Sequence, residues 1–157
     1  MTPTASFQDL KDASVFITGG GSGIGAALTE GFLQQGARVA FVQRSDAADF
    51  CDRMDETYGQ RPLYIPCDIT DTSALQAAIA QAATAHGTVT VLVNNAAIFH
   101  GMRYETLLDV DMDYYYQIMK VNMHSPLVMT RAVAASMVQR GGGSVINQSS
   151  TAAWKAQ

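Results

Sequence analysis

Glycines dominate one short segment of the chain, residues 18–25. It follows the apolar run 15–17 and opens a segment whose Ile24, Leu28 and Phe32 recur every four residues, as on one face of a helix. Bare backbone amides at a helix start can approach a dinucleotide and donate hydrogen bonds to its pyrophosphate. An ordinary glycine-rich turn is the alternative, because the spacing fits Gly-x-Gly-x-x-Gly only loosely. The segment predicts a cofactor site that includes Gly19, Gly21, Ser22, Gly23, Ile24 and Gly25.

Polar residues follow later apolar or helical segments of the chain. Asn94 and Asn95 come at the end of the apolar run 89–93, Asn122 lies in a helical segment, and Ser150 follows the run 144–148. In sheets of parallel strands, the crevice at the carboxyl ends of the strands binds ligands.

The sequence disfavours two other classes of enzyme. Ser150 has no Gly-x-Ser-x-Gly frame, so a hydrolase nucleophile is disfavoured. No Gly-Lys-Ser/Thr follows the glycines, which argues against a P-loop kinase or ATPase.

In this order the motifs resemble the short-chain dehydrogenase/reductase family from about residue 10 to the last residue. The resemblance implies hydride transfer between a nicotinamide cofactor and a carbonyl or alcohol substrate. It implies that Asn95 and Ala96 contact the cofactor and that Ser150 orients the substrate oxygen as a hydrogen-bond donor. It also implies that Asn122 holds a water molecule of a proton relay. From the sequence pattern alone, without the resemblance, Asn122 is an ordinary polar residue of a helix. Ala97 departs from the family, which usually has glycine there.

The end of the second apolar run carries the signal for cofactor choice. It reads Gln43-Arg44 and lacks the carboxylate that would accept hydrogen bonds from an NAD ribose. Arg44 is therefore predicted to favour NADP(H) over NAD, with a solvated surface arginine as the alternative. Asp68 and Ile69 follow the third run and are predicted to belong to the cofactor site, and by resemblance Asp68 contacts the adenine. A helix-start acid is the other interpretation of Asp68.

The family's catalytic Tyr-x-x-x-Lys motif is expected a short distance beyond Ser150, and the printed sequence has no tyrosine there. Tyr116 and Lys120 match the motif literally, and a lysine one helical turn away can lower the pKa of a phenol. They precede both Asn122 and Ser150, however, so we expect them not to be catalytic. Residues 1–157 are then the cofactor-binding part of an oxidoreductase, unable to transfer hydride or to stay monomeric alone. A catalytically inactive nucleotide-binding or interaction protein is the alternative.

Apolar runs alternate with helical patterns along the chain, which predicts an α/β fold with a doubly wound parallel sheet. By resemblance this is a Rossmann-type domain covering 1–157, incomplete because no helical segment follows the fifth run. The runs that should form the strands are 14–18, 37–43, 63–66, 89–93 and 144–148.

Helix boundaries follow from capping residues. The first helix should end at Gly36, and the third should begin at Asp71 or Thr72 and stop at Gly87. The third should bury Leu75, Ile79 and Ala83. A long helix is expected over 111–139, with a bend at Pro126.

Composition excludes several classes of protein. The chain has 157 residues, 48% of them hydrophobic, and a net charge of -4 without any basic run, which disfavours nucleic acid and anionic membranes as partners. Its two cysteines and three scattered histidines predict neither a metal site nor a disulfide framework. No signal core or membrane-length apolar run is present, so we expect a cytoplasmic protein.

The expected partner is a small alcohol or carbonyl compound. The loop 98–102, with His100 as a possible base, and the tail 151–154 indicate a partly apolar pocket. It would suit a hydrophobic alcohol or the flat face of a sugar equally well. Methionines and tyrosines of the segment 111–139 are expected in the core or in a subunit contact, which favours a homo-oligomer in the complete protein.

Overall fold

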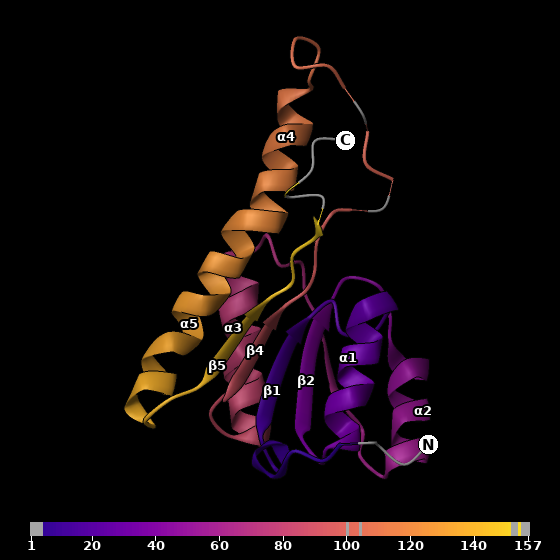
Figure 1. Ribbon diagram of the computed structural model, residues 1–157, viewed down its shortest axis with the longest axis vertical. Helices are drawn as coiled ribbons and strands as arrows, with labels where there is room; N and C mark the ends of the chain where they lie inside the picture. The colour runs from indigo at the N-terminus through magenta and orange to yellow at the C-terminus, as the bar shows by residue number, and fades with distance from the viewer. Residues whose placement is uncertain (1–4, 100, 104, 152–153, 155–157) are drawn as a thin grey trace.

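The computed structural model describes residues 5–99, 101–103, 105–151 and 154. A five-stranded parallel sheet forms its centre, with strand order β3-β2-β1-β4-β5 and helices on both faces (Figure 1). This confirms the predicted doubly wound α/β fold. The strands are β1 (Ser14–Thr18), β2 (Arg38–Gln43), β3 (Leu63–Pro66), β4 (Val91–Asn94) and β5 (Ser144–Asn147).

The sheet separates two hydrophobic cores because successive side chains of a strand point to opposite faces. Phe16 of β1 packs in one core with residues of α3 (Thr72–His86) and α5 (Ser125–Gln139). Its neighbour Ile17 packs in the other core with residues of α1 (Gly23–Gln34) and α2 (Ala48–Tyr58). Strands buried on both faces are apolar throughout, which explains why their sequences run without a polar alternation.

The strand positions agree with the sequence prediction to within two residues at each end. β1 and β3 have the predicted bounds, β2 begins at Arg38, and β5 ends at Asn147. β4 begins at Val91, because Val89 and Thr90 lead into the strand and pair only partly with β1.

The predicted caps of the first and third helices are present. The carboxylate of Asp71 accepts hydrogen bonds from the amides of Ser73 and Ala74 at the start of α3, and Gly87 follows its last residue. Gly36 lies just beyond α1 with a φ of 78°, the left-handed conformation that glycine adopts without strain.

The predicted apolar faces are partly wrong. Ile24 is 62% exposed, and the buried face of α1 is made by Gly25, Thr29 and Leu33. Ile24 is the second residue of α1 and lies among residues that line a cavity at the carboxyl ends of the strands. In α3, Ala78 and Ala82 are fully buried beside Leu75, while Ile79 and Ala83 are half-buried, because small side chains bring the helix close to the sheet.

The long helix predicted over 111–139 is a continuous rod of three parts (Figure 1). α4 (Met112–Met119) passes through a π-helical turn, η2 (Lys120–His124), into α5. The sequence predicts a bend at Pro126, and the structure instead has the wider turn directly before that proline. Pro126 has no N–H to donate to the carbonyl four residues earlier, so the regular helical ladder is interrupted here.

β5 is the edge strand of the described sheet. All four of its residues are exposed, including Val145 at 39% and Ile146 at 45%, although β4 pairs with it along its length. The expectation of a fifth strand without a covering segment agrees with this exposure. In the described part of the chain, none of the helices is long and apolar enough to cross a membrane.

Candidate cofactor site

A cavity of about 1140 Å³ opens at the carboxyl ends of β1, β2, β3 and β4. It is lined by the glycine loop, by the ends of β2 and β3 with the residues that follow them, and by residues of α4 (Met112–Met119) and η2 (Lys120–His124). Most of the predicted cofactor residues line it together: Gly19, Ser22, Gly23, Ile24, Gly25, Arg44, Asp68, Ile69, Asn95 and Ala96.

The glycine loop is held in a close fit that excludes larger side chains. The Gly19 amide donates to the Val42 carbonyl over 2.7 Å, and Gly19 has a φ of 70°. A Cβ atom on Gly25 would overlap the carbonyl oxygen of Gly19. The buried hydroxyl of Thr29 donates to the Gly20 carbonyl over 2.8 Å. The loop therefore presents bare backbone at the start of α1, as a pyrophosphate site requires.

Gly21 is the one predicted glycine that does not line the cavity. Its amide donates to the Gln43 side-chain oxygen over 2.9 Å, and a Cβ at this position would collide with the same carboxamide. The Gln43 amide group donates in turn to Ser45, to its carbonyl over 3.0 Å and its hydroxyl over 3.3 Å. Gln43 thereby joins the glycine loop to the turn after β2.

Asn95 fastens β4 to the glycine loop. Its side-chain amide donates to the carbonyls of Thr18 and Gly19 over 2.9 and 3.3 Å. The Thr18 hydroxyl accepts from the amides of both Asn95 and Ala96 over 2.9 Å. Sequence reasoning missed Thr18 as a site residue, although its place between an apolar strand and the glycines was a usable signal.

Charged side chains occupy the side of the cavity formed by β2 and β3. Arg44 is exposed after β2, and Asp68 follows β3. The pKa of Asp68 is lowered mainly because its carboxylate accepts hydrogen bonds from the amide and the hydroxyl of Thr70, with smaller contributions from the charges of Arg44 and Lys120. Asp68 is therefore ionised at neutral pH.

Asn122 lies in η2, and both its side-chain oxygen and its side-chain amide bond to one residue of the loop after β4. Its oxygen accepts from the Ile98 amide over 2.8 Å, and its amide donates to the Ile98 carbonyl over 3.1 Å. π-helical turns of this kind are frequent at functional sites. The structure therefore gives Asn122 a role in holding this loop against the helix.

Ser150 and the Tyr116–Lys120 pair occupy different positions. Ser150 is exposed, three residues beyond the end of β5, and is not among the residues that line the cavity. Tyr116 and Lys120 do line it, from α4 and η2. The expectation that they are not catalytic stays a prediction. His100 and residues 152–153 lie outside the described residues.

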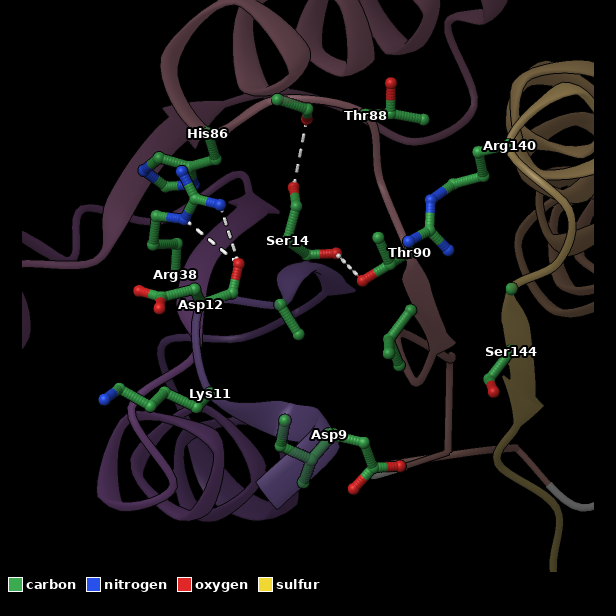
Figure 2. A pocket seen from close by; sticks show the side chains of 15 residues that line it. Asp9, Lys11, Asp12, Ser14, Arg38, His86, Thr88, Thr90, Arg140 and Ser144 are labelled. Atoms are coloured by element: carbon green, nitrogen blue, oxygen red, sulfur yellow. Dashed lines mark hydrogen bonds between the residues drawn. The ribbon is translucent and has the colours of Figure 1, made fainter. Parts of the chain in front are cut away.

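A second cavity, of about 600 Å³, lies at the amino ends of the strands, where Ser14, Arg38 and Ser144 begin β1, β2 and β5 (Figure 2). Some of its polar groups bond to backbone carbonyls, since Arg38 donates twice to Asp12 and the Ser14 hydroxyl donates to Gly87. Burial, and secondarily the charge of Arg38, lowers the pKa of His86 beside it. Among the described residues, no group of three or more histidine, cysteine or acidic side chains is arranged to hold a metal.

Comparisons with known proteins agree with this geometry. Residues 13–157 match the short chain dehydrogenase family. A probable galactose dehydrogenase of Rhizobium meliloti is 41% identical over 96% of this chain, and a D-xylose 1-dehydrogenase of Caulobacter vibrioides is 43% identical over 92%. The chain spans 58% and 56% of the lengths of these relatives.

Solved structures give the same result. A short-chain type dehydrogenase/reductase from Mycobacterium marinum superposes with a TM-score of 0.86 at 25% sequence identity, covering 94% of this chain and 60% of that one. From the glycine loop, the parallel sheet and the family match, we conclude that this chain belongs to the short-chain dehydrogenase family.

Proposed function

We propose that this chain forms the NADP(H)-binding part of an oxidoreductase that interconverts an alcohol and a carbonyl compound. The observation that carries the proposal is the cavity itself, in which bare glycine backbone at the start of α1 lies beside the exposed Arg44. When bound, the nicotinamide would accept or supply the hydride. The backbone of the glycine loop would hold the pyrophosphate, and Asn95 would keep that loop in place.

The preference for NADP(H) over NAD is supported by the end of β2. The residue there, Gln43, carries no charge, and its carboxamide is occupied by Gly21 and Ser45. No carboxylate of this strand end is therefore available to accept hydrogen bonds from a ribose. Arg44 projects from the same turn as an unburied cation, suited to a 2′-phosphate.

An aldose is the substrate class that we propose. The named relatives act on galactose and D-xylose by their descriptions. Oxidation at C1 would move a hydride from that carbon to the nicotinamide and release the hydroxyl proton to a base. Ser150 would donate a hydrogen bond to the reacting oxygen, and Asn122 would support the proton relay by fixing the Ile98 loop. The base is proposed to belong to the family's Tyr-x-x-x-Lys segment, absent after Ser150 in this sequence.

We further propose a cytoplasmic homo-oligomer for the complete protein. Large apolar side chains are exposed along the α4–α5 rod, including Tyr115 at 43%, Met123 at 59% and Leu127 at 58%. Exposed apolar surface of this kind favours association with another copy.

The proposal is tested by calorimetric titration of the chain with NADP+ and NAD+, followed by turnover assays of the complete protein, which includes the Tyr-x-x-x-Lys segment, with a panel of aldoses. We expect binding of both cofactors and tighter binding of NADP+. Cofactor binding with no turnover on any alcohol or carbonyl compound would favour the alternative, an inactive nucleotide-binding or interaction protein. Absence of binding would refute the proposed function and a nucleotide-binding role, and would leave an interaction protein as the remaining alternative.

A further inference from the structure

The cofactor cavity has two facing sides that belong to distant parts of the sequence. The loop between β3 and α3 supplies one side with Asp68, Ile69 and Thr70. The rod of α4 and η2 supplies the other with residues such as Lys120 and Val121. The distance between these two sides sets the room for whatever binds between them.

The hydroxyl of Ser125 joins the two sides. Ser125 is the first residue of α5, and only 3% of it is exposed. Its hydroxyl oxygen lies 2.8 Å from the Ile69 carbonyl and 2.9 Å from the Lys120 carbonyl. Between residues 67–71 and residues 112–125, all of which the structure describes, this is the one hydrogen bond from the loop to the rod.

The Ile69 carbonyl depends more on this hydroxyl than the Lys120 carbonyl does. A hydroxyl has one hydrogen to donate. The Lys120 carbonyl already accepts from the Ser125 backbone amide across the π-helical turn. The remaining acceptor is therefore Ile69, and removal of the hydroxyl would leave that carbonyl without its donor from the helix.

The loop that Ser125 contacts also has hydrogen bonds within itself and to β2. Asp68 accepts from both the amide and the hydroxyl of Thr70, and Asp71 caps α3 immediately afterwards. At its other end, the Cys67 amide donates to the Gln43 carbonyl of β2. To these contacts Ser125 adds the hydrogen bond that holds the middle of the loop, at Ile69, against the rod.

We infer that Ser125 is a positioning residue for the adenosine half of the cofactor, acting through the Ile69 loop. The inference rests on the proposed cofactor function. The adenosine half is assigned because β3 and β2 lie together at one end of the sheet and Arg44 follows β2. Ser150, the proposed substrate-binding residue, follows β5, the strand at the opposite edge of the sheet from β3, so the adenosine half is placed away from it.

The test titrates the chain and its variants separately with 2′,5′-ADP, by calorimetry, and with nicotinamide mononucleotide, by NMR. Ser125→Ala should weaken binding of 2′,5′-ADP by about fivefold to tenfold, the effect of one lost hydrogen bond, and leave the mononucleotide unchanged. Ser136→Ala is the matched control, since that half-buried hydroxyl donates only within α5, to Val133. Ser125→Thr retains the hydroxyl and should retain binding.

Ser125→Cys keeps the side-chain volume and replaces the hydroxyl by a weak donor, so it gives the answer if the alanine variant unfolds. Unchanged 2′,5′-ADP affinity in a folded Ser125→Ala or Ser125→Cys variant would overturn the inference. So would an equal loss for both ligands, which indicates general loosening of the fold. A wild-type chain that binds neither ligand would instead overturn the proposed function on which the inference rests.

Discussion

Asn94 and Asn147 lie opposite each other at the carboxyl ends of β4 and β5, and the Asn94 side-chain amide donates to the Asn147 side-chain oxygen over 2.9 Å. Asn94 is buried, and the same amide also lies 3.4 Å from the Thr130 hydroxyl of α5. This contact fastens the exposed edge strand immediately before the turn that carries Ser150. It is therefore a link between the stability of the sheet and the position of the proposed substrate-binding serine.

Replacing Asn147 with alanine should destabilise the chain by about 1–3 kcal/mol, because the buried Asn94 amide loses its better acceptor. Urea unfolding followed by circular dichroism measures the change. Gln148→Ala is the control, since this exposed side chain bonds only to Ser149, over 3.4 Å. Equal stability of the two variants would show that the asparagine pair contributes nothing.

Replacing Arg44 with alanine should weaken NADP+ binding by about 1.5–3 kcal/mol, the range of a charge-assisted hydrogen bond, and leave NAD+ binding nearly unchanged. Competitive calorimetric titrations give both affinities. Arg140→Ala provides a control for net charge, because Arg140 lies at the second cavity, at the amino ends of the strands. The NADP(H) assignment is wrong if the Arg44 variant keeps the wild-type ratio of the two affinities.

Replacing Gly25 with alanine should destabilise the chain by about 3 kcal/mol or more, since the new methyl group overlaps the Gly19 carbonyl and the backbone must shift. Gly31→Ala tests the same substitution on the same helix, where the added Cβ would meet no atom of the described residues within 4 Å apart from its chain neighbours and the helix's own backbone. It should keep or raise stability by up to about 1 kcal/mol, because alanine favours helix. The denaturant concentrations at the unfolding midpoints of both variants, compared with the wild-type chain, measure the two changes in stability.

His86 should make the fold less stable in mild acid. Burial, with help from the charge of Arg38, lowers its pKa below the ordinary 6.5, so the folded chain binds fewer protons there than the unfolded chain. The His86 contribution to stability therefore falls as pH drops below 6.5 and levels off below the folded pKa. Thermal melts across this range should show a smaller decline for His86→Gln. Parallel declines would exclude His86 as the cause.

In an active form of the protein, Ser150→Ala should depress kcat strongly, whereas Tyr116→Phe should leave it nearly intact. The reason is positional: the literal Tyr-x-x-x-Lys match precedes Asn122 and Ser150, although its side chains line the cofactor cavity. Steady-state kinetics with saturating cofactor measures both variants. A collapse of kcat in the Tyr116 variant alone would place the proton transfer on α4.

The sequence by itself determined the positions of the strands along the chain, their parallel direction and the position of the glycine loop. These features follow from local patterns, because a buried parallel strand is a continuous apolar run and a pyrophosphate loop needs adjacent glycines. Capping residues such as Asp71 are equally local, since the carboxylate bonds to amides two and three residues away.

Only the tertiary structure decided which residues hold the cavity together. Thr18 meets Asn95 across 77 positions of sequence, and Ser125 meets Ile69 across 56. No local pattern encodes such a pair, because each partner is an ordinary polar group until the fold removes both from water. Ile24 is a further example. Its helical spacing suggests burial, but in the fold its side chain is exposed and lines the cofactor cavity. Periodicity reports which face of a helix is apolar, and only packing decides what, if anything, covers that face.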